Sequence, residues 1–323
     1  MANEVIVANQ GDLLATHVMA RRLEMLLHQK PYMKRLCAYR GDTRASGSNV
    51  IKQPQLDDDD IGESVAENSS ISGQTAVSDG SYTMTPGRIA IKRKVSDLIQ
   101  GIDATGQLNG PALANYNFNA VQRGFDALVC AGIASLTGTA GTSGMPMTAD
   151  DWFTAQQTLI ERNVEGQLAA LLHPHQWTDL QDDLRGEVGP WQLDTQVQAA
   201  VRNSSGRNLK GILNDVQVWT STQVADANTG ADHDGGMFQI PEDSTIDAVT
   251  GKFLGDGAFS FAEGSPEEVT LIPGTRVMAP GGVVYSTLTA DGDVANQSIV
   301  TNYFASVAVA EAAKGTKIRT DHA

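Results

Sequence analysis

The chain has 323 residues, a net charge of −15, 41% hydrophobic residues and 19% charged residues, which is the composition of a globular protein that can bury a sizeable core. The negative charge argues against tight nucleic-acid binding by the whole surface, because that affinity comes chiefly from cations that release condensed counterions. No run approaches the roughly 18 apolar residues of a membrane span, and residues 5–8 are too short an apolar run for a signal peptide. We therefore expect a protein that is made and kept in a cytoplasm, without a membrane.

The first 40 residues are basic, with six Lys/Arg against three Asp/Glu. Apolar residues at helical spacing predict a helix that ends before Pro31; they are Leu13, Leu14, Val18, Leu23, Leu26 and Leu27. The two cysteines, Cys37 and Cys130, lack partner histidines at ligand spacing, so we expect neither a disulfide framework nor a zinc site from them. They are interpreted as small core residues.

Residues 42–88 form a stretch that is too long and too polar for an ordinary loop. Only nine of its 47 residues are Val, Ile, Leu, Met or aromatic, and structureless loops beyond about 15 residues are uncommon inside compact domains. The return limb alternates, with Tyr82 and Met84 on one face and Ile89 and Ile91 in phase with each other after a one-residue shift at Pro86. The pattern predicts a long two-stranded arm, and the alternative is a disordered acidic insert.

The length of this arm predicts that it reaches another subunit. Each limb of about 20 residues at about 3.3 Å per residue spans roughly 65 Å, whereas a compact body of this size has a radius of gyration of about 20 Å. An isolated two-stranded ribbon is marginal in water. We therefore expect its apolar residues to be covered by a second copy of the chain; they are Leu56, Ile61, Val65, Ile71 and Val77.

The rest of the chain predicts an α+β protein. Residues 111–136 have helical spacing, with Pro111 at the first turn and Gly138 beyond the end. Thr148 and Asp151 have capping-box spacing at the start of the next helix, and an apolar strand at residues 167–172 precedes a helix that begins at Pro174. Strands and turns follow. The clearest strand is the alternation from residue 299 to residue 309.

Nucleotide and hydrolase motifs are absent from the sequence: it has no GxxxxGK[ST], no GxGxxG between a strand and a helix, and no GxSxG. Asp57–Asp60 lack the ligand spacing of a calcium loop. The best metal candidate combines His173 and His175 with the DHD sequence around His233, which would suit zinc or manganese in a metallohydrolase. Ordinary turn chemistry also accounts for these residues. We expect no cofactor and no enzymatic site.

The order of the elements resembles the major capsid protein of tailed double-stranded DNA bacteriophages, which has the Hong Kong ninety-seven type fold. The resemblance covers nearly the whole chain and rests on the segments VAEN and IAIKRKVSDLI, HPHQWTDLQDDLRG, NLKGILNDVQVWTS, GDGAFSFAEG and NYFASVAVAEAAKGTKI. It implies an N-terminal arm and helix at 1–46 and a long extended β-hairpin loop at 47–92. It further implies a peripheral domain at 93–164 and 276–323 with a spine helix at 111–136, and an axial domain at 165–275.

The resemblance implies a structural protein that self-assembles into pentamers and hexamers of an icosahedral head in the bacterial host cytoplasm. The head would enclose double-stranded DNA without sequence-specific binding, and the acidic wall would let DNA slide. Expected partners are a portal and either a separate scaffolding protein or none, with or without a cement protein. An encapsulin-type compartment shell has the same fold and is the first alternative. Lys52 is the only lysine between Asp42 and Arg88 and lies near the arm base, so covalent cross-linking of neighbouring subunits is not expected.

Two sets of contact residues follow from this interpretation. The arm acids Asp57, Asp58, Asp59 and Asp60 should pair with a basic strip on a neighbour, formed by Arg21, Arg22, Lys34 and Arg35 or by Lys92, Arg93 and Lys94. Polar and glycine-bearing residues between 186 and 207 should gather at the capsomer centre; they are Gly186, Gly189, Asn203, Ser204, Gly206 and Arg207.

Overall fold

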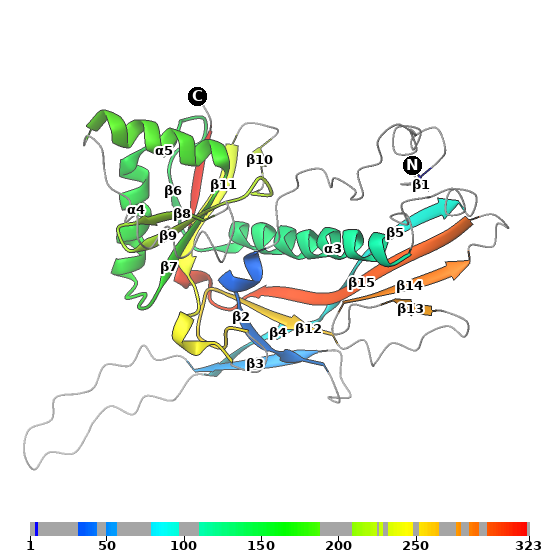
Figure 1. Cartoon of the computed structure of the whole chain (residues 1–323). Coiled ribbons are helices and arrows are strands. Elements are labelled where there is room, and N and C mark those ends of the chain that lie inside the picture. The colour runs from blue at the N-terminus through cyan, green and yellow to red at the C-terminus, as the bar shows by residue number, and fades with distance from the viewer. Residues whose placement is uncertain are drawn as a thin grey trace, which may run out of the picture.

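The computed structural model describes residues 4–5, 32–43, 50–56, 79–96, 110–187, 209–224, 226–228, 232–247, 252–264, 276–278, 284–290 and 296–321. These residues form two seven-stranded sheets and a separate two-stranded sheet. In Figure 1 the long helix α3 (Gly110–Gly132) runs along the first sheet, and the second sheet stands at one end of that helix. The predicted helix before Pro31 lies outside the described residues.

The first sheet is built around its longest strand, β15 (Asn296–Val309). One side of β15 pairs with β5, and the other side pairs first with β14 and then with β12. The remaining strands extend the sheet from these neighbours: β1 pairs with β5, β2 with β12, and β13 with β14. Their bounds are β1 Glu4–Val5, β2 Ala38–Asp42, β5 Gly87–Ser96, β12 Phe259–Glu263, β13 Arg276–Met278 and β14 Val284–Ala290.

The strand predicted at residues 299–309 is confirmed as part of β15, and Tyr303, Ala305, Val307 and Val309 of its predicted apolar face pack in a buried cluster. Burial does not alternate throughout, because Asn302 is buried as well as Thr301 and Tyr303. The segment NYFASVAVAEAAKGTKI, however, is not one continuous strand. The 3-10 helix η6 (Ala312–Lys314) interrupts the chain after β15, and β16 (Gly315–Asp321) then joins the second sheet. The C-terminal segment therefore connects both sheets.

Two glycines bring α3 close to the first sheet. A Cβ on Gly124 would lie 2.7 Å from Ile89 Cγ2, and one on Gly132 would lie 2.8 Å from Phe259 Cε1. The predicted helix at residues 111–136 is confirmed, with its last turn tightened into the 3-10 helix η2 (Ile133–Ser135). Gly138 follows with φ of +86°, a left-handed conformation that suits a residue without Cβ.

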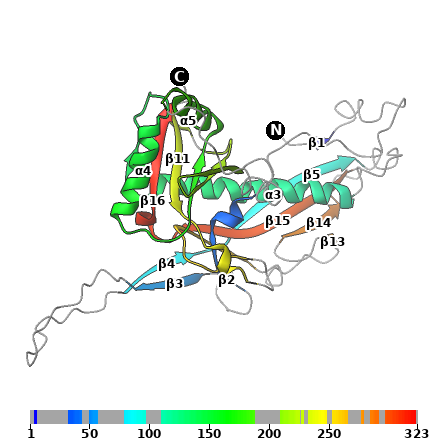
Figure 2. The ribbon, with the colours of Figure 1, turned by 60° about the vertical axis from the view of Figure 1, so that its left-hand side comes forward.

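The second sheet has the strand order β6-β16-β11-β7-β9-β8, with β10 also paired to β11. Figure 2 shows the helices α4 (Ala149–Glu161) and α5 (Pro174–Glu187) beside this sheet. The predicted capping box is present, since Thr148 and Asp151 exchange side-chain and backbone bonds at the start of α4. The strands are β6 Thr139–Ala140, β7 Leu168–Leu172, β8 Leu209–Leu213, β9 Val216–Thr220, β10 Asp226–Asn228 and β11 Asp232–Gln239.

The two sheets do not follow the predicted domain boundaries, which placed the peripheral domain at 93–164 and 276–323 and the axial domain at 165–275. We call the first sheet with α3 the first unit, and the second sheet with α4 and α5 the second unit. Strand β12 belongs to the first unit although it lies within 165–275, and β6, α4 and β16 belong to the second unit although they lie in the flanking ranges. Sheet membership depends on hydrogen-bonded partners far away in the sequence, which a division into consecutive ranges does not capture.

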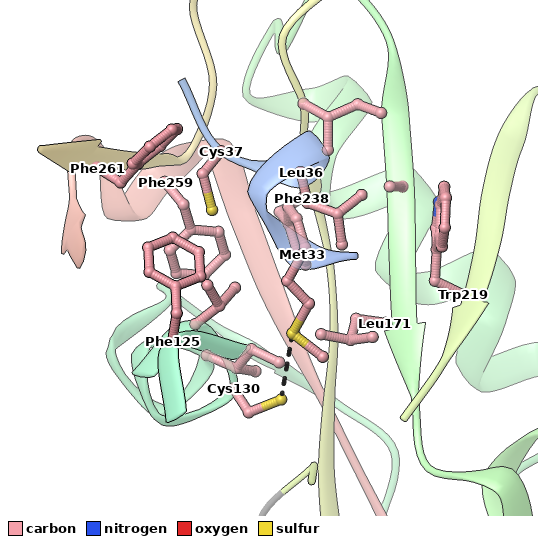
Figure 3. Close-up of a cluster of buried hydrophobic side chains, with 14 of the residues drawn as sticks. Met33, Leu36, Cys37, Phe125, Cys130, Leu171, Trp219, Phe238, Phe259 and Phe261 are labelled. Carbon is pink, nitrogen blue, oxygen red and sulfur yellow. Dashed lines mark hydrogen bonds between the residues drawn. The ribbon is translucent and has the colours of Figure 1, made fainter. Parts of the chain in front are cut away.

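A single buried cluster joins the two sheets. It includes Phe125 of α3, Phe261 of β12, Trp219 of β9 and Phe238 of β11, together with Met33 of the 3-10 helix η1 (Met33–Leu36). Figure 3 shows η1 between the aromatic side chains of the first unit and the strands of the second. Cys37 and Cys130 are free, buried thiols within this cluster, which confirms their interpretation as core residues.

Candidate assembly interface

The base of the predicted arm is an antiparallel hairpin of β3 (Ile51–Leu56) and β4 (Asp79–Met84). The register runs from Ile51 opposite Met84 to Leu56 opposite Asp79. A two-stranded arm is therefore confirmed at its base. The other predicted arm contacts, Asp57–Asp60, Ile61, Val65, Ile71 and Val77, lie outside the described residues.

The one-residue shift at Pro86 was interpreted as a bulge within the arm, and this is wrong, because the return limb changes from one sheet to another there. Strand β4 ends at Met84, and β5 begins at Gly87 in the first sheet. Met84 is buried, while Ile89 and Ile91 pack against the main core cluster. The one-residue phase change at Pro86 thus marks the junction between the hairpin and the body.

Beyond this junction, polar side chains hold the hairpin to the body. Gln55 Nε2 donates to the carbonyl of Ala310 at 2.8 Å, and the Tyr82 hydroxyl lies 2.9 Å from Ser260 Oγ. A cavity of about 240 Å³ lies between the hairpin and the body, lined by β2, β3, β4 and the segments before β12 and after β15. Each of these hydrogen bonds contributes only about 0.5 to 1.5 kcal/mol, and the buried Met84 fixes the end of β4 to the body.

The basic stretch on β5 divides between the two faces of the first sheet. Arg93 faces α3, since its Nε donates to Asn117 Oδ1 at 2.6 Å. Alternation along a strand places Arg88, Lys92 and Lys94 on the opposite face, where Arg88 and Lys92 are exposed and Lys94 is partly buried. The predicted strip at Lys92, Arg93 and Lys94 is therefore not one surface; Arg88, Lys92 and Lys94 share a face.

Lys34, which was predicted to pair with a neighbour, has a partner within its own chain. Its Nζ lies 2.8 Å from Glu263 Oε1 and 4.5 Å from the centroid of the Tyr303 ring. The side chain of Lys34 is 35% exposed, so the structure leaves an inter-subunit role for Lys34 and Arg35 as a prediction. Arg21 and Arg22 lie outside the described residues.

Glu263 is a buried carboxylate that sequence reasoning missed. It also accepts a hydrogen bond from the Tyr303 hydroxyl at 2.8 Å and lies 2.5 Å from Lys252 Nζ. Burial alone would raise the pKa of Glu263, but the ammonium groups of Lys34 and Lys252 hold that pKa below its ordinary value. The network joins η1, β12 and β15. No local sequence signal could have found it, because the partners are 229 positions apart in the case of Lys34.

The three histidines of the metal alternative come together, but in a geometry unsuited to a metal. The rings of His173 and His233 stack with centroids 3.7 Å apart, and those of His173 and His175 with centroids 4.9 Å apart. His173 Nδ1 accepts the backbone N–H of His175 at 3.3 Å and so caps α5. Among the described residues, no group of three or more His, Cys, Asp or Glu side chains could hold a metal ion.

Helix α4 carries two exposed apolar side chains that the sequence analysis did not single out. Phe153 is 46% exposed and Ile160 is 62% exposed, whereas Trp152, Ala155 and Leu159 face the second core cluster. Phe153 and Ile160 are seven residues apart and therefore share one face of the helix. Each of them directly follows a buried apolar residue of the same helix, Trp152 or Leu159. These adjacent apolar pairs are the sequence signal that could have identified them.

The predicted capsomer-centre residues are only partly described. Gly186 lies within α5, and Gly189, Asn203, Ser204, Gly206 and Arg207 fall outside the described residues. None of the helices in the described part of the chain is long and apolar enough to cross a membrane.

Comparison with known proteins identifies the fold. No protein-family model matches the sequence, and no curated protein sequence matches it. Solved structures match over nearly the full length. The structure titled Mycobacterium phage Che8 shares 15% sequence identity with this chain. The two superpose with a TM-score of 0.58 over 94% of this chain and 96% of that chain. The capsid structure of cyanophage P-SCSP1u is 12% identical with a TM-score of 0.59, covering 96% of this chain and 94% of that chain.

The chain has the phage major capsid fold. The holo-SrpI encapsulin complex of Synechococcus elongatus PCC 7942 has a similar fold, with 12% identity, a TM-score of 0.61, and coverage of 98% of this chain and 95% of that chain. The predicted α+β capsid fold, with its long helix α3, is thereby confirmed, and the extended hairpin is described at its base, β3 and β4. At these identities the capsid fold alone is shared.

Proposed function

We propose that this chain is the major capsid protein of a tailed double-stranded DNA phage. The observation that carries the proposal is the β3–β4 hairpin, which leaves the body on polar contacts and continues into the acidic residues 57–60. A chain with the capsid fold and such an arm is suited to a shell, where the arm lies across an adjacent subunit. The protein would act in the virion and would assemble in the bacterial host cytoplasm, without catalysing a reaction.

The acceptor for the arm would be the outer face of β5 on a neighbouring copy. Arg88 and Lys92 are exposed there, and Lys94 lies on the same face, opposite in charge to Asp57–Asp60. Each exposed ion pair contributes only about 0 to 1 kcal/mol, but the contact repeats in every subunit of a shell. Arg93 would not take part, because Asn117 holds its side chain on the α3 face.

The second unit would form the capsomer centre, with residues between 186 and 207 near the axis of pentamers and hexamers. The net charge of −15 would favour a wall to which confined DNA does not adhere. A portal would complete the head, with or without a separate scaffolding protein and a cement protein. An encapsulin-type shell is the second candidate, supported by the fold of the SrpI encapsulin.

Electron microscopy of the expressed chain tests the proposal. Closed shells are the expected result, and a stable monomer at every concentration would contradict it. Deletion of residues 55–78 should leave a folded subunit that no longer forms shells. Nucleic-acid absorbance of purified particles distinguishes a phage head from an enzyme-storing compartment.

A charge exchange tests the arm contact separately. Arg88→Glu with Lys92→Glu should impair assembly, and Asp57–Asp60→Lys should restore it when the two sets are combined. Arg93→Gln is the matched control on the same strand. If the exchange fails to rescue while the wild type still forms shells, the arm docks elsewhere and the capsid function stands.

A further inference from the structure

The two edges of the β3–β4 hairpin differ in their ability to take up another strand. Among the described strands, β3 and β4 pair only with each other. Pro54 lies in the middle of β3, directly opposite Ser81 of β4. Residues opposite each other in an antiparallel pair alternate between those that exchange two hydrogen bonds and those that exchange none. Because proline has no N–H, Pro54 and Ser81 fit the second kind.

This register determines which backbone groups point to the outer edges. The N–H of Ser81 points away from β3, and so does that of Thr83, which is two residues further along and opposite Lys52. Ser81 and Thr83 are both exposed. The outer edge of β3 lacks a donor at Pro54, and a proline on an edge strand hinders the pairing of a further strand. The outer edge of β4 is therefore the one suited to receive a strand.

The hairpin lies on the face of the first sheet that is opposite α3. Phe259 of β12 packs against Gly132 of α3, so its neighbour Ser260 points away from that helix. The Tyr82 hydroxyl lies 2.9 Å from Ser260 Oγ, on this far side of the sheet. Figure 1 shows β3 and β4 on one side of the first sheet and α3 on the other. The hairpin therefore shares its face of the sheet with the exposed cations of β5.

On this face, β4 is on the side of β15 and β5. A Cβ on Gly41 of β2 would lie 4.0 Å from Ile51 Cδ1, which places the start of β3 beside β2. A Cβ on Gly264 would lie 2.6 Å from Phe304 Cβ of β15 and 3.5 Å from Pro86 Cβ, just after β4. The sheet order runs from β5 through β15 and β12 to β2. A strand added to the outer edge of β4 would therefore lie over β15 and β5.

We propose that the outer edge of β4 receives an extended acidic segment of a second copy as a third strand. Charge identifies the occupant. Arg88 is anchored beside this edge, because its Nε donates to Asn302 Oδ1 of β15 at 2.6 Å, and Lys92 is exposed on the same face. Residues 57–60 are the only run of four consecutive acids in the sequence. This docking rests on the proposed capsid function and adds that a backbone edge, and not the cations alone, holds the arm.

Hydrogen exchange tests the edge on the wild-type chain. Shells are compared with dissociated subunits, and a peptide covering residues 80–84 should gain protection on the order of tenfold or more on assembly, because the amides of Ser81 and Thr83 become hydrogen-bonded. A peptide covering residues 50–55 should gain much less, since the outer edge of β3 stays without a partner strand. Wild-type shells with no gain at residues 80–84, or with equal gains in both peptides, would overturn the third strand while the capsid function stands.

Ser81→Pro tests the same edge by mutation. The hairpin should tolerate it, because Pro54 already occupies the opposite position. Urea denaturation of the subunit should stay close to the wild type, and the yield of shells should fall on the order of tenfold with the lost N–H donor. Ser81→Ala keeps the N–H and is the matched control, which should assemble like the wild type. Equal yields from the two variants would overturn the proposal, and if Ser81→Pro unfolds the subunit, the exchange measurement on the wild type decides.

Zero-length cross-linking identifies the occupant. Shells are assembled from a mixture of isotope-labelled and unlabelled subunits and treated with a carbodiimide, which joins amines to carboxylates. Links between Lys92 and residues 57–60 of a differently labelled copy are the expected result. Links from Lys92 to another segment of the second copy would overturn the acidic run as the occupant. A wild-type chain that forms no shells at all would contradict the proposed function, and this docking with it.

Discussion

Glu263 Oε1 lies 2.8 Å from Lys34 Nζ, although the two residues are 229 positions apart in the sequence. The carboxylate is 2% exposed and also lies 2.5 Å from Lys252 Nζ. Glu263→Gln removes the only charge that compensates both ammonium groups in this network. Because a broken buried ion pair leaves uncompensated charge, we expect a loss of about 3 kcal/mol in the free energy of unfolding, measured by urea denaturation.

The matched control for this change is Lys314→Gln. Lys314 and Glu311 form an ion pair at 2.9 Å in which the side chains are 28% and 46% exposed. Exposed pairs contribute about 0 to 1 kcal/mol. A similar loss in both variants would show that the burial of Glu263 is not what makes its pairing matter.

The same network predicts how stability changes in acid. The pKa of Glu263 is held below its ordinary value of about 4.3, so its ionised form contributes stability that is present above this value and is lost as the pH falls through the lower folded-state pKa. Between pH 5 and pH 3 the free energy of unfolding should therefore fall more steeply for the wild type than for Glu263→Gln. Parallel pH profiles would contradict the direction of the shift.

Local patterns predicted much of the fold. Thr148 and Asp151 carry their capping box within four residues, and the alternation through Tyr303 depends only on burial of one face, so both could be predicted from neighbouring positions. The change of sheet after Val309 could not. The segment between β15 and β16, residues 310–314, has neither proline nor glycine to mark a break. The partner strand of β16, β11, is also distant in the sequence.

The candidate interface also has one part that could be predicted from the sequence and one part that could not. The arm was predicted because a long polar stretch is unusual whatever its surroundings. The strand period that puts Ile89 and Ile91 against the core also puts Arg93 on that face, but its hydrogen bond to Asn117 could not be predicted, because the partner lies on another element.

Gly132→Ala tests the close contact between α3 and the first sheet. Intrinsic helix propensity alone would make alanine more stable by about 1 kcal/mol. The new Cβ, however, would lie 2.8 Å from Phe259 Cε1 in a ring that is fully buried. We expect a net destabilisation of about 1 to 3 kcal/mol, measured by urea denaturation.

Gly124→Ala is the comparison on the same helix. Its Cβ would meet Ile89 Cγ2 at 2.7 Å, but Ile89 is only partly buried and can rotate. Its cost should be smaller than that of Gly132→Ala. A stabilised Gly132→Ala variant would show that the helix can move away from the sheet without loss.

His173 should act on stability through its cap and not through a metal. His173→Ala removes the acceptor for the His175 N–H, and loss of a helix cap costs about 0.5 to 2 kcal/mol. His173→Asn should recover most of this, since asparagine is a preferred cap. Both free energies can be measured in urea with and without added zinc. Stabilisation of the wild type by zinc that is lost in both variants would favour the metal site.

The exposed face of α4 should matter for assembly and not for folding. Phe153 and Ile160 are 46% and 62% exposed, so replacing both with serine should change the free energy of unfolding by about 0.5 kcal/mol or less. In a shell, neighbouring subunits cover part of each other's exposed apolar surface. If the face with Phe153 and Ile160 is part of that covered surface, the double variant should assemble less completely than the wild type. Sedimentation of particles measures this. Gln157→Ser, between the two positions, is the control, because its side chain bonds to Glu161 on the same helix. Normal shells from the double variant would show that this face points away from neighbouring subunits.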